Sequence, residues 1–243
     1  QGEAAERVAE HWKLSREALD AFAVRSHQRA AAAAEAGYFT REVVPIPVNA
    51  LKDKDWAEPT VALFSADETI RPGTAAEKLA TLKSSFRPEG RLTAGNSSQI
   101  SDGAAVLLLM SEAAVKRLGV TPKARIRAFT TVGSDPTLML TGPIAATRRV
   151  LAQAGLSLAD IDLYEVNEAF APVPLMWQQE LGADLERLNV NGGAIALGHP
   201  LGASGARIMT SLLHELARRG GRYGLQAICC AGGMGTATII ERL

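Results

Sequence analysis

Three side chains lie where a predicted strand ends or a glycine-rich loop begins, and each is of a type that takes part in catalysis. Asn167 follows an alternating segment, 161–166, and leads into a predicted helix. His199 lies in the loop 191–205, which has five glycines in fifteen residues. Cys229 ends a predicted strand before a glycine-rich turn. An amide can hold a water or an oxyanion, an imidazole can move a proton, and a thiol beside backbone N–H groups can act as base or nucleophile.

Each of these positions also has a structural interpretation, which the sequence leaves open. Asn167 can be a helix cap, since asparagine is common there. A lone histidine is more often structural than catalytic, and loop glycines also serve tight turns and close packing. Cys230 fits better as a small buried hydrophobic side chain. The remaining histidines, His11, His27 and His214, occur in helical patterns, and we expect them at the surface without a role.

The composition excludes several functional classes. Lys plus Arg number 26 and Asp plus Glu number 26 in 243 residues, so no excess of positive charge favours nucleic acid or an anionic membrane as partner. The longest strongly apolar run, Ala104–Met110, is far short of the roughly 20 residues of a membrane helix. The two cysteines are adjacent, which predicts a reduced, cytoplasmic protein. Their spacing to histidines predicts no metal site.

The elements that must position these side chains are those of a layered α/β protein. Residues 3–36 read as helix, with Ser15 able to cap a second segment and Gly37 ending it. Residues 38–92 contain several prolines, which predicts an irregular lobe that covers a site. A boundary is expected near 92–100, and the apolar run 104–110 predicts a strand buried on both faces.

The rest of the chain alternates between helix and strand. We expect helices from Ser111 to Gly119, Gly142 to Gly155, 169 to 182 and Ala206 to Arg219, a capping turn at Ser157–Asp160, and strands at about 124–132, 161–166, Leu225–Cys229 and Thr236–Glu241, the last two antiparallel.

Three motifs in register carry a resemblance to a known family. They are Asn167-Glu-Ala-Phe, Gly198-His-Pro-Leu-Gly-Ala-Ser-Gly-Ala-Arg207 and Cys229-x-Ala-Gly-Gly-Met-Gly235. In order and spacing they resemble three of the four signature segments of the thiolases, the acetyl-CoA C-acyltransferases. The segment Gly95–Ala105 extends the likeness, which covers essentially the whole chain. The Asn-Glu-Ala-Phe form differs from the ketoacyl-ACP synthases, which share the fold.

The resemblance implies a thiolase fold, layered α/β/α/β/α, with a loop domain that binds CoA. By this likeness, residues 1–100 would be the remainder of the loop domain, 101–121 the last elements of the N-terminal half, and 122–243 the C-terminal domain. The first α/β half would be largely missing. A sheet edge and much apolar surface would then be exposed, which predicts low stability for the chain alone.

The resemblance also implies a reaction. Thiolases condense two acyl-CoA molecules or cleave 3-ketoacyl-CoA with CoA, through an acyl-cysteine and without a further cofactor. By motif, His199 would activate the nucleophilic thiol and donate to the thioester oxyanion, and Asn167 would hold the water that completes this hole. Cys229 would be the acid and base. The backbone N–H of Ala231, where the family usually has glycine, would serve the acyl-enzyme.

Six further residues are implied as contacts of acyl-CoA or CoA. Arg71 is expected at the nucleotide phosphates, although on sequence alone it reads as a solvated surface charge. Phe86 would pack on the pantetheine and Ser98 would hydrogen-bond to it. The others are Met139, expected to line the acyl pocket, and Ala169 and Phe170.

One departure from the family pattern concerns the nucleophile. The segment that carries the acyl-accepting cysteine aligns before Gln1, and both cysteines present belong to the last motif. We therefore expect the C-terminal three-fifths of a thiolase, active only with the missing segment supplied, and forming a homo-oligomer (dimer or tetramer) as the family does. The alternative is an inactive thiolase-like fragment that binds acyl-CoA, or a subunit that completes a site in trans.

Overall fold

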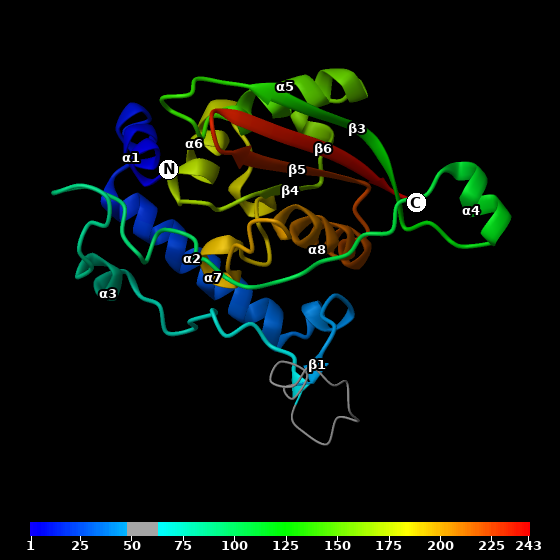
Figure 1. Ribbon diagram of the computed structural model, residues 1–243, viewed down its shortest axis with the longest axis horizontal. Coiled ribbons are helices and arrows are strands. Elements are labelled where there is room, and N and C mark those ends of the chain that lie inside the picture. The colour runs from blue at the N-terminus through cyan, green and yellow to red at the C-terminus, as the bar shows by residue number, and fades with distance from the viewer. Residues whose placement is uncertain (48–62) are drawn as a thin grey trace.

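A computed structural model of the chain describes residues 1–47 and 63–243. Its centre is a four-stranded sheet in the order β3-β6-β5-β4 (Figure 1). The strands are β3 (Ala124–Gly133), β4 (Leu163–Val166), β5 (Tyr223–Cys230) and β6 (Met234–Arg242). β6 pairs antiparallel with β3 and β5, whereas β4 pairs parallel with β5. The predicted final antiparallel pair is therefore confirmed.

Helices cover both faces of this sheet. Among the described residues the helices are α1 (Gly2–His11), α2 (Arg16–Glu35), α3 (Ala76–Ala80), α4 (Glu112–Leu118), α5 (Gly142–Ala154), α6 (Pro172–Leu181), α7 (Ala194–Leu197) and α8 (Ser204–Arg219), with short 3-10 turns at Tyr38–Arg41, Leu158–Asp160 and Leu185–Arg187, and not all of them contact the sheet. The largest core cluster joins α5 and α6 to one face of the sheet. A smaller cluster joins Leu212 and Leu216 of α8 to Leu163 and Ile240 on the other face.

Local signals set most of these boundaries. The Ser15 hydroxyl accepts the N–H of Ala18 at 3.2 Å, which caps α2 as predicted. Gly155 and Gly220 end α5 and α8 in the left-handed conformation that glycine favours. The capping box predicted at 157–160 is also present.

The strand predicted at 104–110 is wrong. Residues 101–111 form no regular element and lead outward to α4, which lies apart from the body (Figure 1). Val106 is 90% exposed and Leu108 79%. A doubly buried strand needs hydrogen-bonding neighbours and a layer on each face, and none of the described strands pairs with this segment. Phe129 on the edge strand β3 is likewise 72% exposed.

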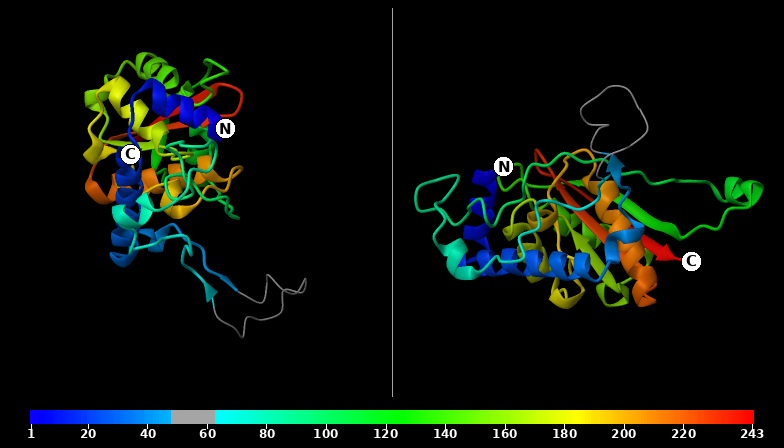
Figure 2. Two further views of the ribbon diagram at one scale, coloured as in Figure 1. Left: turned by 90° about the vertical axis from the view of Figure 1, so that its left-hand side faces the viewer. Right: turned by 90° about the horizontal axis from the view of Figure 1, so that it is seen from below.

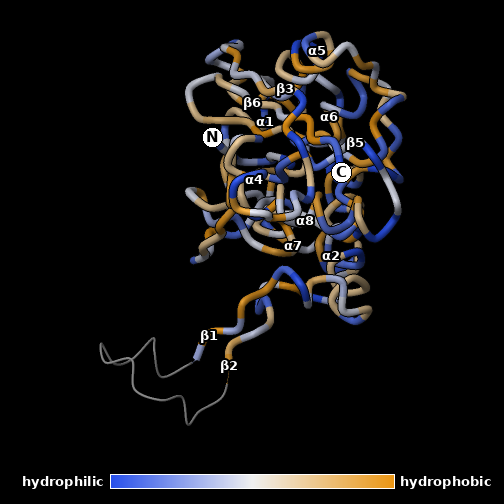
Figure 3. Tube along the Cα trace, turned by 90° about the vertical axis from the view of Figure 1, so that its right-hand side faces the viewer, coloured by the Kyte–Doolittle hydropathy of each residue, from blue (hydrophilic) through white to orange (hydrophobic). Residues whose placement is uncertain are grey.

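The predicted irregular lobe is mostly irregular where the structure describes it. Besides α3 and one 3-10 turn it has a two-residue pairing of β1 (Ile46–Pro47) with β2 (Leu63–Phe64). This pair stands away from the rest of the fold (Figures 2 and 3). The part of the prediction that concerns residues 48–62 lies outside the described residues.

Candidate active site

The carboxyl ends of two parallel strands bring the first and third motifs to one edge of the sheet. Val166 of β4 pairs with Ala227 of β5, and the N–H of Asn167 donates to the carbonyl oxygen of Ala227 at 3.0 Å. Cys229 follows two residues later on β5, opposite Gly235 of β6. Asn167 and Cys229 therefore lie at the same end of the sheet. Cys229 is one residue farther along the strand direction than Asn167.

The second motif reaches this edge through the imidazole of its histidine, and Gln99 holds the backbone of that histidine. The N–H of His199 donates to the carbonyl oxygen of Gln99 at 2.8 Å. Gly198 precedes it with a φ of +82°, and a Cβ there would lie 2.2 Å from Oγ of Ser101. Only glycine fits at this position. The imidazole Nε2 of His199 lies 3.4 Å from Nδ2 of Asn167, so the two predicted catalytic side chains meet.

Asn167 is not a helix cap, because α6 begins only at Pro172 after the cap residue Ala171. The asparagine is 2% exposed, and its Oδ1 has no hydrogen-bond partner among the described residues. A buried amide oxygen without a partner is costly, so such atoms usually bind a water or a ligand. This arrangement agrees with an amide that holds a water beside the imidazole.

Both titratable groups of the site have shifted pKa values. Burial lowers the pKa of His199, and the positive charge of Arg207 lowers it further. Burial raises the pKa of the Cys229 thiol to about 12, and Cys230 beside it adds to the rise. At neutral pH the site therefore holds a neutral imidazole, able to accept a proton, and a neutral thiol, able to donate one.

A buried carboxylate that the sequence reasoning missed supports the loop of the second motif. Oε2 of Glu168 accepts the Ser26 hydroxyl at 2.6 Å and the Ile195 N–H at 3.1 Å. Oε1 accepts Nδ2 of Asn189 at 2.9 Å. Burial raises the pKa of Glu168, whereas these hydrogen bonds oppose the rise. Its place in the Asn-Glu-Ala-Phe motif was the available signal.

Four residues implied as CoA contacts lie together beside this edge. The Ser98 N–H donates to the carbonyl oxygen of Ala169 at 3.1 Å, and Ser97 forms an isolated antiparallel β-bridge with Phe170. Phe86 meets Phe170 edge to face, with ring centroids 5.7 Å apart. Their backbone and aromatic surfaces form a strip that continues from the Asn167 motif.

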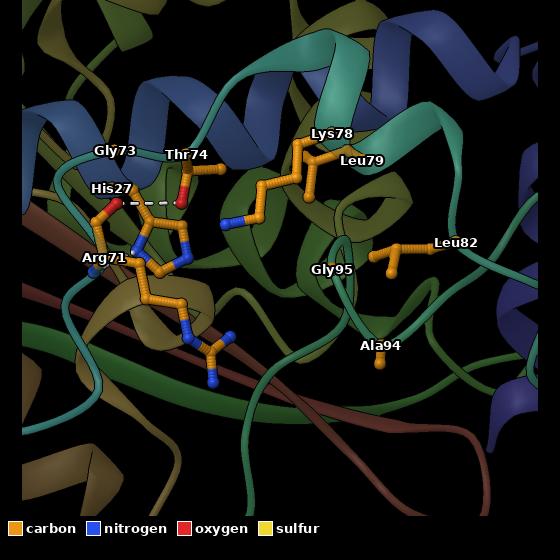
Figure 4. Close-up of a pocket in the computed structure, with 9 residues that line it drawn as sticks. All are labelled: His27, Arg71, Gly73, Thr74, Lys78, Leu79, Leu82, Ala94 and Gly95. Carbon is orange, nitrogen blue, oxygen red and sulfur yellow. Dashed lines mark hydrogen bonds between the residues drawn. The ribbon is translucent and has the colours of Figure 1, made fainter.

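Arg71 lies in a cavity of about 440 Å³, into which its side chain and that of Lys78 both extend (Figure 4). The lining residues are His27, Arg71, Gly73, Thr74, Lys78, Leu79, Leu82, Ala94 and Gly95. Two cations in one cavity suit an anionic ligand. Lys78 was not predicted from the sequence, because the segment 38–92 was expected to be an irregular lobe and no motif marks this lysine.

The expected surface position of His27 is wrong. His27 is 3% exposed, and its Nδ1 accepts the backbone N–H of Arg71 at 3.2 Å. Burial, with a smaller contribution from the Arg71 charge, lowers its pKa to about 4. His27 is therefore a neutral acceptor that holds the segment carrying Arg71.

Gln99 connects this cavity to the histidine loop. Its Oε1 accepts Nη2 of Arg71 at 3.2 Å, and its Nε2 donates to the carbonyl oxygen of Ile195 at 3.2 Å. Its own carbonyl oxygen is the acceptor for His199. One residue thus contacts the cation of the cavity and the loop of the imidazole.

Two predicted residues lie on neighbouring turns. Ala231 is exposed on the β5–β6 turn, where the Ser134 hydroxyl donates to the carbonyl oxygen of Gly233 at 2.9 Å. Met139 is half-buried in the adjoining 134–141 loop and packs against the main core. Among the described residues, no hydrogen bond joins either of them to Asn167 or His199.

Residues 1–47 and 63–243 contain neither a candidate metal site nor a helix that could cross a membrane. No three acidic, histidine or cysteine side chains are grouped so that they could ligate a metal ion. No helix there has the length and hydropathy needed to cross a membrane.

Comparison with known proteins points to one family. The family described as thiolase, C-terminal domain, matches residues 120–242, and that described as thiolase, N-terminal domain, matches residues 1–113. An acetyl-CoA acetyltransferase of Pseudomonas aeruginosa is 50% identical over 241 residues, which are 99% of this chain and 60% of that protein. The chain thus spans about 60% of the length of the curated relatives it matches.

Solved structures agree with the sequence matches. The crystal structure of Bacillus anthracis acetyl-CoA acetyltransferase superposes with a TM-score of 0.93 at 46% identity, covering all of this chain and 60% of that one. Human mitochondrial 3-ketoacyl-CoA thiolase in complex with CoA gives a TM-score of 0.90 at 45% identity, covering 99% and 58%. These likenesses confirm the fold that the three motifs predicted.

Proposed function

Because the chain belongs to the thiolase family, we propose that it provides the acid–base groups and the CoA site for an acyl-CoA C-acyltransferase. The reaction is the condensation of two acyl-CoA molecules or the cleavage of 3-ketoacyl-CoA by CoA. The observation that carries the proposal is the contact of His199 with Asn167 at the end of the sheet where Cys229 is the second-last residue of β5.

In the cleavage direction each proton can be followed. A cysteine other than Cys229 and Cys230 gives its proton to neutral His199 and attacks the 3-keto carbon as thiolate. The oxyanion that forms on the 3-keto oxygen is stabilised by the backbone N–H of Ala231, and the thioester oxygen of the substrate is bound by His199 and by a water on Asn167. The bond between C2 and C3 then breaks, and its electron pair remains on C2.

Cys229 completes the proton transfers. Its thiol protonates C2, so acetyl-CoA leaves and the cysteine becomes a thiolate. That thiolate takes the proton of incoming CoA, whose sulfur attacks the acyl-cysteine and releases acyl-CoA. The departing cysteine sulfur takes its proton back from His199, which restores the resting enzyme. A thiol with a pKa raised to about 12 is protonated at rest, as the first of these steps requires. Condensation is the reverse sequence.

The CoA substrate would extend from the cavity of Arg71 and Lys78 to the strip of Phe86, Ser98 and Phe170. The two cations suit the phosphates of the nucleotide end, and the aromatic strip suits the apolar pantetheine arm. Gln99 lies between these two regions and contacts the first through Arg71.

The second candidate function is binding of acyl-CoA without chemistry, or completion of a site together with another chain. It is favoured by the finding that the cavity and strip are formed by this chain's own residues, none of which needs the acyl-accepting cysteine. The presence of Asn167, His199 and Cys229 together favours the enzyme, since a binding protein needs none of the three.

Two measurements on the same chain separate these functions. Calorimetric titration with CoA should show binding that weakens at least about tenfold in Arg71→Ala and Lys78→Ala, because each removes a charge-assisted contact. Lys116→Ala, on the distant helix α4, is the matched control and should bind as wild type. An absence of CoA binding would overturn both functions.

Thiolysis of acetoacetyl-CoA is the second measurement. Turnover that is lost in His199→Ala and in Cys229→Ala supports the enzyme. CoA binding without turnover, in the presence of the acyl-accepting segment as a separate chain, would leave only the binding function.

A further inference from the structure

His199 makes a second hydrogen bond, on the side of the ring away from Asn167. Its Nδ1 lies 2.5 Å from Oγ of Ser204, the first residue of α8. Ser204 is 2% exposed, and its hydroxyl also donates to the carbonyl oxygen of Pro200 at 3.0 Å. The imidazole is therefore held at both nitrogens, by Ser204 and by Asn167.

The hydrogen bonds of the Ser204 hydroxyl bear on which nitrogen of His199 carries hydrogen. A hydroxyl has one proton to donate, and a carbonyl oxygen such as that of Pro200 only accepts. With the Ser204 proton directed to Pro200, the same oxygen presents a lone pair to Nδ1, which must then donate. The Nε2 atom is left with its own lone pair, and this agrees with Nδ2 of Asn167, a donor, as its neighbour.

We propose that Ser204 is a positioning residue that holds His199 in the Nδ1–H tautomer, with Nε2 free to take a proton. The inference rests on the proposed function only for its use, since the tautomer is a property of the resting chain. The wrong tautomer would present N–H to an incoming thiol and could not accept its proton.

Ser204 also acts once the ring is protonated. The imidazolium keeps its Nδ1–H directed at the Ser204 oxygen, and a hydrogen bond from a charged donor is stronger than one from a neutral donor. This contact opposes burial and the charge of Arg207, both of which lower the pKa of the ring. Loss of the hydroxyl should therefore lower the His199 pKa further, by roughly one unit.

Nitrogen-15 NMR of the imidazoles in the full chain tests the tautomer directly, because protonated and unprotonated ring nitrogens have well-separated shifts. The His199 signals are identified by their loss in His199→Gln. We expect a protonated Nδ1 and an unprotonated Nε2 in wild type and in Ser204→Thr, which keeps the hydroxyl. Ser204→Ala should give a mixture of tautomers and the lowered pKa.

Thr210→Ala is the matched control. Thr210 lies on the same helix, and its hydroxyl donates to the carbonyl oxygen of Ala206 at 2.8 Å in the same local pattern, four residues back. This change should leave the His199 shifts and pKa as in wild type. In the thiolysis assay Ser204→Ala should lower kcat about 10- to 100-fold with little change in KM for CoA, and Ser204→Thr should restore most of it.

An Nε2–H tautomer in wild type, or an unchanged tautomer and pKa in Ser204→Ala, would overturn the proposal. If Ser204→Ala does not fold, the wild-type and Ser204→Thr spectra still decide the tautomer. These results are independent of the proposed function, whose failure would appear as an absence of CoA binding with the Nδ1–H tautomer intact.

Discussion

The Cys229 thiol should react with alkylating agents far more slowly than an ordinary cysteine. Its pKa is raised from 9.0 to about 12 by burial and by the neighbouring Cys230. At pH 7.5 the thiolate fraction is therefore about a thousandfold smaller than for a thiol of unshifted pKa. A more basic thiolate is about 20-fold more nucleophilic, so the net reaction should be roughly 50-fold slower.

The assay is alkylation by iodoacetamide, followed by peptide mass spectrometry at a series of pH values. Cys230→Ser removes the second thiol, and the chain unfolded in urea gives the unshifted rate. Steric shielding would also slow the reaction, but the two causes differ in pH dependence. A shielded thiol of ordinary pKa stops accelerating near pH 9, whereas a thiol with a pKa of about 12 gains about tenfold per unit beyond pH 10.

Alkylation of folded Cys229 at the unfolded rate, or a plateau near pH 9, would refute the reasoning. The consequence for catalysis is direct: a thiol that titrates near neutrality would be partly ionised at rest. It would then be a poorer proton donor to C2 than the proposed cleavage sequence requires.

Two further predictions concern stability. His27 is neutral in the fold with a pKa of about 4 but has an ordinary value of 6.5 when unfolded, so only the unfolded state gains a proton between these values. The free energy of unfolding should fall by about 3 kcal/mol from pH 6.5 to pH 4. The variant His27→Asn keeps an acceptor for the Arg71 N–H, and in urea titrations its free energy of unfolding should fall much less over this pH range. An equal fall in the variant would contradict the assignment of the loss to His27. Gly235→Ala would place a Cβ 2.3 Å from backbone carbon of Gly142, which should destabilise the fold by about 1–3 kcal/mol or more in the same urea assay. Gly202→Ala is the matched control, with no atom within 4 Å, and similar losses for both would show that the close approach is not the cause.

The parts of the fold predicted from sequence are those decided by local signals. Ser15, Gly155 and Gly220 mark helix ends because capping depends on a few adjacent residues. The segment 104–110 failed because apolar content predicts a buried strand only where a sheet exists to receive it. The predicted surface position of His27 was wrong for a related reason. The segment around Arg71, 44 residues away in the chain, covers this histidine, and helical periodicity cannot predict contacts with so distant a segment.

In the candidate site, too, features visible in the local sequence were predicted and contacts between distant segments were not. The motifs predicted Asn167, His199 and Cys229, because reactive side chains at strand ends and in glycine-rich loops are visible in the sequence. The polar residues that hold them were missed. Gln99 and Glu168 each join segments far apart in the chain, and their side chains have no property that distinguishes them from surface residues until the fold is known.

Two glycines of the histidine loop are explained by contacts within the protein, as the structural interpretation of loop glycines predicts. A Cβ at Gly193 would lie 2.2 Å from the Glu168 carboxyl carbon, and one at Gly198 would lie 2.2 Å from the Ser101 hydroxyl. Both glycines thus let the loop lie against polar groups that fix its path. Because His199 follows Gly198 directly, any larger residue there would displace the imidazole from Asn167 and Ser204 together. The glycine-rich pattern of this loop is therefore required to position the imidazole that acts as its base.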